Sequence, residues 1–267
     1  MKKRIIKIVL LALLVAAVAA VHKRVQFEAR EAERLVEEAQ TEGVASEDAL
    51  ETFSVLRAGE NVTLGRVVEN TELGGVDIIT AAEDGTETVH TFTDVSMDSW
   101  YLDAVNYVVS AGLMNGSNEK PAFMPDYAIQ REFFALLLYR FTDSEVGDLS
   151  NPFQDVSETI WFRDAVTWAT GRDIMKPVTE KEFGVGRYMT CEQAIVCLYR
   201  LAGEPETDGS LADYPYASKV SEYGRSAMDW AWKNGLISEE ECVWYPPQAI
   251  SRAQTALLLM RLSEKIF

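Results

Sequence analysis

Hydrophobic residues recur at helical spacing in three similar passages of the chain. Each passage opens near an aromatic residue and continues as an amphipathic helix, and the passages are 98–114 with Trp100, 159–175 with Trp161, and 221–237 with Tyr223. Across a loop, each is followed by a second apolar helix, at residues 133–141, 194–203 and 255–262. The period is about sixty residues, and a fixed period indicates that one helix–loop–helix unit has been copied. We expect the copies to bury their apolar faces against one another.

The chain before the repeats follows other patterns. Residues 22–44 are rich in Glu, Ala and Arg, with apolar residues at helical spacing, which predicts a helical stalk. Short strand-like runs follow at 64–69, 76–82 and 86–92, with Asp84-Gly85 as a hairpin signal between the last two. We therefore expect a small β-rich segment at 45–91, separate from a mainly α-helical region that holds the three repeats.

The first residues have the pattern of an export signal. Met1–Arg4 is basic, residues 5–21 are apolar apart from Lys7, and small residues gather at the end of that run. We expect a signal peptide within residues 1–21, and the alternative is an uncleaved membrane anchor formed by residues 5–21. Both interpretations place the rest of the chain outside the cytoplasm, because the positive charge precedes the apolar run.

The chain is strongly acidic, with 42 Asp and Glu against 25 Lys and Arg and a formal net charge of −17 at pH 7. A surface of this sign repels nucleic acid, so we expect no nucleic-acid partner. The three cysteines are too few and odd in number for a disulfide framework, and Cys191 and Cys197 lie on different faces of one predicted helix. We expect these two and Cys242 to be small apolar fillers.

The sequence carries no catalytic or metal-binding motif. His22 and His90 lie outside the repeats, and no nucleophile elbow, zinc-protease, phosphate-loop or calcium-loop motif occurs. Counting carboxylates does not exclude a glycosidase-type pair, but solvation of the surface explains the acidic residues more simply. We therefore expect a protein that is not an enzyme and that uses no cofactor and no metal.

The first copy contains a series of short motifs. In order, they are Phe92-Thr-Asp94-Val95, Trp100, Gly112-Leu-Met-Asn-Gly116, Phe123-Met-Pro125 and Ile129-Gln-Arg131. This series resembles the S-layer homology (SLH) domain, a family found as three tandem copies in bacterial envelope proteins. The resemblance divides the chain into repeats at residues 92–149, 150–204 and 205–267.

The later copies keep parts of this series and lose others. The second copy keeps Asp155 and Trp161, and it has Asp173 and Cys191 at the places of the turn glycine and the motif arginine. The third copy has Tyr214-Pro-Tyr216 and Tyr223 at the places of Phe-x-Asp and Trp, and it keeps Gly235 and Arg252. These departures put a binding site built on the second copy in doubt.

The resemblance implies a pseudo-trimeric helical bundle with three prongs. Members of the family bind secondary cell-wall polysaccharide, often with pyruvylated sugars, in grooves between repeats, which attaches the protein to the wall without a covalent bond. The resemblance thus implies a location at the cell wall or cell surface. The candidate carbohydrate-binding residues are Asp94, Trp100, Gly112, Gly116, Arg131, Asp155, Trp161, Tyr223, Gly235 and Arg252.

The chemistry of these residues suits an anionic sugar. A helix N-terminus favours an anion, and an arginine there offers a fork that matches a carboxylate. Two alternatives remain at this point: Asp94 and Asp155 cap the helices that follow them, and Arg131 and Arg252 form salt bridges to neighbouring carboxylates. The alternative function is a membrane-anchored protein-interaction or scaffold module whose repeats no longer bind sugar.

Overall fold

The computed structural model describes residues 62–82, 84–117 and 120–267. The expected signal or anchor at 5–21, the expected stalk at 22–44 and the first part of the expected β-rich segment lie outside the described residues.

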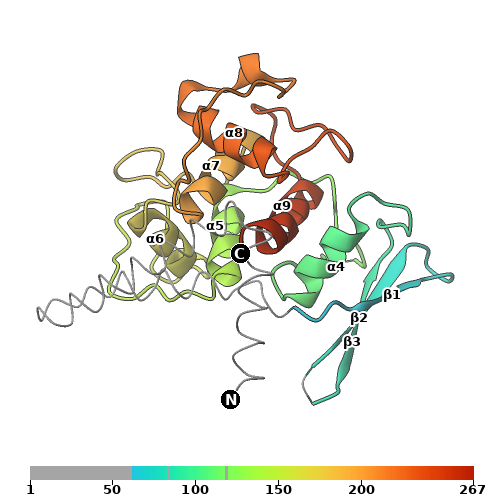
Figure 1. The fold of residues 1–267 in the computed structure, drawn as a ribbon. Coiled ribbons are helices and arrows are strands. Elements are labelled where there is room, and N and C mark those ends of the chain that lie inside the picture. Colours follow the sequence, from blue (N-terminus) through green and yellow to red (C-terminus); the bar gives the residue numbers. More distant parts are fainter. Residues whose placement is uncertain (1–61, 83, 118–119) are drawn as a thin grey trace, which may run out of the picture.

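The described chain begins with a small antiparallel sheet. Its strands are β1 (Arg66–Glu69), β2 (Val76–Ala81) and β3 (Glu87–Phe92), paired in sequence order (Figure 1). Val76 pairs with Phe92 across the β2–β3 hairpin, and Gly85 in its turn has a φ of 82°, which glycine adopts without strain. The three strands predicted from the alternating runs and the Asp84-Gly85 signal are confirmed.

Six α-helices follow in the described part of the chain, two in each repeated unit (Figure 1). Unit 1 holds α4 (Leu102–Ser110) and α5 (Arg131–Phe141), unit 2 holds α6 (Arg163–Gly171) and α7 (Cys191–Leu201), and unit 3 holds α8 (Arg225–Lys233) and α9 (Arg252–Lys265). The main helix pairs join different units: α5 packs on α6, α7 on α8, and α9 returns to pack on α4. Each of the three prongs of the bundle is therefore a helix pair that two units share, and the last unit packs against the first to close the ring.

A ring of backbone hydrogen bonds fixes the threefold arrangement. The amide of Ile129 donates to Ile250 O at 3.0 Å, that of Ile250 to Met189 O at 2.9 Å, and that of Met189 to Ile129 O at 2.9 Å. These three residues precede α5, α7 and α9 at the same distance in sequence, and all are buried. The closed cycle confirms the pseudo-trimeric bundle, and it satisfies backbone groups that would otherwise be costly to bury.

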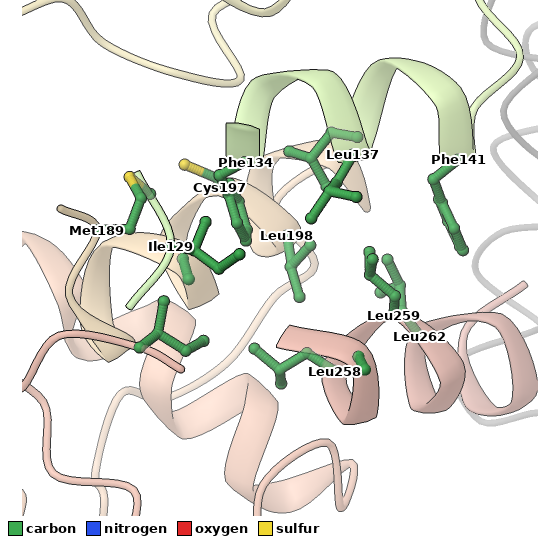
Figure 2. Packing of buried hydrophobic residues seen from close by; sticks show 14 of the residues in the cluster. Ile129, Phe134, Leu137, Phe141, Met189, Cys197, Leu198, Leu258, Leu259 and Leu262 are labelled. Carbon is green, nitrogen blue, oxygen red and sulfur yellow. The ribbon is translucent and has the colours of Figure 1, made fainter. Parts of the chain in front are cut away.

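The second helices of the three units supply the central core. Figure 2 shows Leu137 of α5, Leu198 of α7 and Leu258 of α9 among the buried side chains gathered between these helices. Cys197 is the seventh residue of α7, a place that Leu137 holds in α5. Cys191 and Cys197 are free and buried, and burial raises the pKa of both thiols to about 12, so they agree with the expected role as apolar fillers.

The sheet is joined to the first unit rather than separate from it, contrary to the expectation from sequence. Val76 and Ile78 of β2 are fully buried in the common core, and β2 contacts α4. Asn106 of α4 donates to Gly65 O at 2.9 Å, and Ser110 Oγ accepts from Gly65 N at 2.8 Å. The buried alternate positions of β2 needed a partner, and the outer face of α4 provides it.

Among residues 62–82, 84–117 and 120–267, no helix is long and apolar enough to cross a membrane.

Candidate functional site

In each unit, a loop leads toward the second helix, and the family pattern has Phe-x-Pro in this loop. In units 1 and 2, an aspartate binds the backbone of the loop. Asp94 accepts hydrogen bonds from the backbone amides of Phe123 and Met124, both at 2.7 Å. Asp155 accepts from the amides of Phe183, Gly184 and Val185 at 2.7–2.9 Å. Each carboxylate therefore holds a loop that lies about thirty residues further along the chain. Hydrogen bonds from backbone N–H groups to a carboxylate are strong because the acceptor is charged.

The pKa of Asp155 follows from these contacts. Burial alone would raise it, but the three backbone donors outweigh burial and lower the pKa below its usual range. The capping alternative placed the two aspartates at the start of the following helix; instead, the N-cap positions of α4 and α6 are Tyr101 and Phe162, which make no side-chain cap bond.

Arg131 at the start of α5 reaches across to unit 2. Its Nε donates to Phe183 O at 3.1 Å and its Nη2 to Lys176 O at 2.7 Å, and its guanidinium carbon lies 4.8 Å from the centre of the Phe183 ring. The residue is only 8% exposed. Burial lowers the pKa of Arg131 from its ordinary value, but the guanidinium remains charged at neutral pH.

Arg252 at the start of α9 makes the same contacts with unit 1. Its Nε donates to Phe123 O at 2.8 Å and its Nη2 to Asn115 O at 2.7 Å, with the guanidinium carbon 4.7 Å from the Phe123 ring centre. For both arginines the acceptors are main-chain carbonyls of the neighbouring unit, not the carboxylates of the salt-bridge alternative. Arg131 and Arg252 thus join adjacent units through charged hydrogen bonds and a cation–π contact.

The junction between units 2 and 3 is rebuilt without an arginine. Cys191 stands at the arginine position and Trp244 at the position of Phe123 and Phe183, and both are buried. The carbonyl that the arginine would have bonded, Trp244 O, accepts instead from the hydroxyl of Tyr214. Tyr214 is the residue where the family pattern has Phe, so one extra hydroxyl replaces the lost guanidinium as donor to the same carbonyl.

The junction between units 2 and 3 also differs in having a carboxylate, that of Glu192, bonded across it. The carboxylate of Glu192 accepts from Ser221 N at 2.7 Å and from Ser221 Oγ at 2.9 Å. Gly224 makes room for it, because a β-carbon at Gly224 would overlap Glu192 Oε1. Units 1 and 2 have aromatic residues, Tyr101 and Phe162, where unit 3 has Gly224. The protein's own carboxylate therefore occupies the space beside Tyr223.

The turn after the first helix keeps one backbone conformation in all three units. Gly112 and Gly235 have φ values of 67° and 65°, and Asp173 adopts 58° at the equivalent place. Aspartate is among the few other residues that accept the left-handed region, so the loss of glycine in unit 2 leaves the turn intact. Gly116 has a different role: a β-carbon there would lie 2.7 Å from both Ala122 O and the Phe92 ring.

The three aromatic residues that open the repeats are exposed. Trp100 is 39% exposed, Trp161 is 58% and Tyr223 is 60%. Each lies at the entry to the first helix of its unit, and Trp161 also contacts Phe133 of α5, with ring centres 5.3 Å apart. Exposed indole and phenol faces of this size are typical of contact surfaces, whereas Trp168 and Trp230 inside the helices are buried packing residues.

The structure assigns places to the ten predicted site residues without testing sugar binding. It gives Asp94, Asp155, Arg131 and Arg252 internal contacts, and it leaves the three opening aromatics exposed. Sequence reasoning assigned no contact to Phe133 or to the Tyr214 hydroxyl, which the structure places against Trp161 and Trp244 O. Phe133 looks like an ordinary helix position, and only the departure of Tyr214 from the Phe-x-Asp pattern was visible. In the described part of the chain, no cluster of acidic, histidine and cysteine side chains could hold a metal ion.

Comparison with known families agrees with this geometry. Two stretches match the S-layer homology domain, residues 91–132 and 152–195. They cover the motifs of units 1 and 2, from Phe92 into α5 and from Phe153 into α7. We therefore refer to units 1 and 2 as SLH repeats 1 and 2. The third unit lies outside the matched residues.

Known surface proteins of Lysinibacillus and Brevibacillus are similar to about half to three fifths of this chain. The "Surface-layer 125 kDa protein" of Lysinibacillus sphaericus is 28% identical over 169 residues, which is 61% of this chain and 14% of that protein. The "Surface layer protein" of Brevibacillus choshinensis is 30% identical over 164 residues, 60% of this chain and 14% of that protein. The "Middle cell wall protein" of Brevibacillus brevis is 32% identical over 136 residues, 48% of this chain and 12% of that protein. The chain thus spans about one seventh of the length of these relatives.

Proposed function

We propose that this chain is a non-catalytic cell-surface protein that its SLH repeats attach to the cell wall by binding secondary cell-wall polysaccharide. The observation that carries the proposal is the pair of SLH matches, in a chain whose relatives are named as surface-layer and cell-wall proteins. The third unit supports it as a diverged repeat, because α8 and α9 take part in the same cyclic hydrogen bonds and helix pairs as the other units.

Two of the three junctions have the features that suit a sugar polymer. At the junctions of repeats 1 and 2 and of unit 3 with repeat 1, an arginine supports the loop, and the unit that the arginine contacts carries an exposed indole: Trp161 for Arg131, and Trp100 for Arg252. An indole face accepts the apolar face of a sugar ring, and a guanidinium favours an acidic substituent such as a pyruvate ketal. At the third junction, Cys191 stands in place of the arginine, and the carboxylate of Glu192 bonded to Ser221 disfavours an acidic substituent beside Tyr223. We therefore propose two polymer-binding junctions rather than three.

A pull-down on cell-wall sacculi tests this function. The full chain should sediment with sacculi that keep their polysaccharide and stay in solution with sacculi stripped of it. Titration against the released polysaccharide should give about two binding sites per chain. Trp161→Ala and Trp100→Ala should each remove one site, whereas Tyr223→Ala should leave both. Equal sedimentation with intact and stripped sacculi would refute the proposal.

The second candidate is a protein-interaction module. The closed junction between units 2 and 3 and the net charge of −17 favour it, because an acidic surface weakens attraction to an anionic polymer. The protein-interaction candidate predicts that sacculi stripped of polysaccharide under mild conditions, which keep their proteins, still bind the chain. It also predicts that protease treatment of the sacculi abolishes binding.

A further inference from the structure

Strand β3 is an outer strand of the sheet and has an open edge. The strand order is β1-β2-β3, and in residues 62–82, 84–117 and 120–267 no further strand pairs with the side of β3 that faces away from β2. Figure 1 shows the β2–β3 hairpin extending away from the helices. Residues 87–89 of β3 are exposed, and Val89 is exposed to 57%. An unpaired strand edge offers a row of amide and carbonyl groups to another strand.

Two hydrogen bonds show which backbone groups of β3 face this edge. Before the strand, Ala82 N donates to Thr86 O across the hairpin at 2.9 Å. Just after the strand, Thr93 N donates to Pro121 O at 2.8 Å instead of to β2. Because residues of an antiparallel strand point their amide and carbonyl alternately toward and away from a neighbour, the even-numbered residues of β3 face β2. The residues whose amide and carbonyl face the open edge are Glu87, Val89 and Thr91. In the described part of the chain, no other segment bonds these groups.

The opposite edge of the sheet is protected. β1 has four residues, and Gly65 just before it already uses its amide and its carbonyl in hydrogen bonds with Ser110 and Asn106 of α4. Arg66 and Glu69 place a charge at each end of β1. Short length and charged residues are devices that keep an edge strand from pairing. In contrast, β3 has six residues in unbroken register with β2 and contains neither lysine nor proline.

We propose that β3 is a dimer interface, at which two copies of this chain join their sheets edge to edge into one continuous antiparallel sheet. A twofold axis at Val89 sets Val89 against Val89 of the second copy, and Glu87 against Thr91. In this register every open-edge amide and carbonyl of both strands has a partner. A shift by two residues in one direction leaves Thr91 unpaired. A shift in the other direction sets Glu87 against Thr93, whose amide is already bonded to Pro121.

The side chains of the same residues suit this register. Val89 and Ile79, which pair across the hairpin, lie on the face of the sheet opposite to the buried Ile78. The two copies therefore form a continuous apolar row across the axis. Glu87 lies opposite a threonine instead of a carboxylate, and within its own sheet it has Arg66 at 4.0 Å. No like charges are therefore directly opposed across the axis, where they would destabilise the strand pair.

The small area of one strand pair makes this a weak dimer. Stable protein interfaces bury roughly 1,200–2,000 Å² in total, more than two short strands provide, so we expect a dissociation constant of about 10 µM to 1 mM. The net charge of −17 makes the copies repel one another, and salt screens this repulsion. Dimerisation should therefore strengthen as salt rises, whereas a dimer held by ion pairs would weaken. This interface does not require polysaccharide binding.

Sedimentation velocity of the full chain from about 5 µM to about 1 mM tests the interface. Val89→Pro removes an open-edge amide and leaves the ladder with β2, and Val89→Lys sets two like charges opposite each other. Each variant should weaken dimerisation at least about tenfold. The matched control is Val68→Lys, which changes an exposed valine on the same face of β1 and should dimerise like the wild type. All variants keep residues 5–21, so association through that apolar run would persist in both Val89 variants.

A cross-link locates the twofold axis. Val89→Cys should form a disulfide between two copies under mild oxidation with copper phenanthroline, because the Cα atoms of directly opposed residues lie about 5.5 Å apart. Val68→Cys, with the same native cysteines, should not. A wild type that stays monomeric at about 1 mM, or Val89→Pro and Val89→Lys variants that dimerise as the wild type does, would overturn the proposal.

Amide hydrogen exchange identifies the occupant of the edge in the full chain. The amides of Val89 and Thr91 should exchange fast in dilute protein and more slowly as the concentration rises, because pairing with a second copy protects them. Slow exchange at every concentration would show that something other than a second copy covers the edge, and it would also overturn the proposal.

Discussion

Removing the Arg131 side chain should destabilise the whole ring of units. Arg131→Ala deletes two charged hydrogen bonds to carbonyls of repeat 2, at 3.1 and 2.7 Å, and the cation–π contact with Phe183. Buried hydrogen bonds to a charged group contribute about 1.5–3 kcal/mol each, and a desolvated cation–π contact about 1–2 kcal/mol. Because these contacts share one side chain and are not independent, we expect a loss of about 3–5 kcal/mol of unfolding free energy.

The assays are urea unfolding, which gives the free energy, and thermal unfolding of the full chain, both followed by tryptophan fluorescence and circular dichroism. A loss of 3–5 kcal/mol should lower the melting temperature by about 6–20 °C, since 1 kcal/mol corresponds to about 2–4 °C for a domain of this size. Arg131→Lys keeps the charge but cannot reach both carbonyls with a planar fork, so it should lose about half as much. The control Arg66→Ala removes an exposed ion pair with Glu87 at 4.0 Å and should change stability by less than about 1 kcal/mol. An Arg131→Ala variant as stable as Arg66→Ala would refute the reasoning.

Three further predictions concern the other internal contacts. Tyr214→Phe removes the donor to Trp244 O and should cost about 1–3 kcal/mol in urea unfolding; no loss would show that the hydroxyl does not replace the arginine. Cys191→Arg, which restores the family residue, should destabilise by about 1–3 kcal/mol in thermal melts because Cys191 is fully buried and a longer side chain would overpack its surroundings, and a more stable variant would contradict this packing. Asp155→Asn should cost about 1 kcal/mol at pH 7. Since the folded pKa of Asp155 is lowered, its contribution is present above the unfolded pKa of about 4 and is lost as pH falls through the folded value, so wild type and variant should converge in melts at about pH 2.

The sequence by itself determined the local elements and their number. The alternating runs before residue 92 predicted the three strands, and the threefold recurrence of an aromatic residue and an apolar stripe predicted two helices per unit. These features depend on periodicity along a short stretch, which is a local property of the chain. The SLH motifs of repeats 1 and 2 were likewise readable, because their spacing is fixed by a turn, a loop and a helix start that are close in sequence.

Only the tertiary structure decided which elements meet and what the motif residues contact. The pairing of α9 with α4 joins residues about 150 positions apart, and no periodicity encodes such a contact. Arg252 hydrogen-bonds the carbonyl of Phe123 across 129 positions, so its internal role was invisible from spacing. Cys191 and Tyr214 stand where the family pattern has Arg and Phe, and in the sequence they looked like two separate losses. In the structure these two residues form one buried junction with Trp244, because a carbonyl taken out of water needs a donor, whichever residue supplies it.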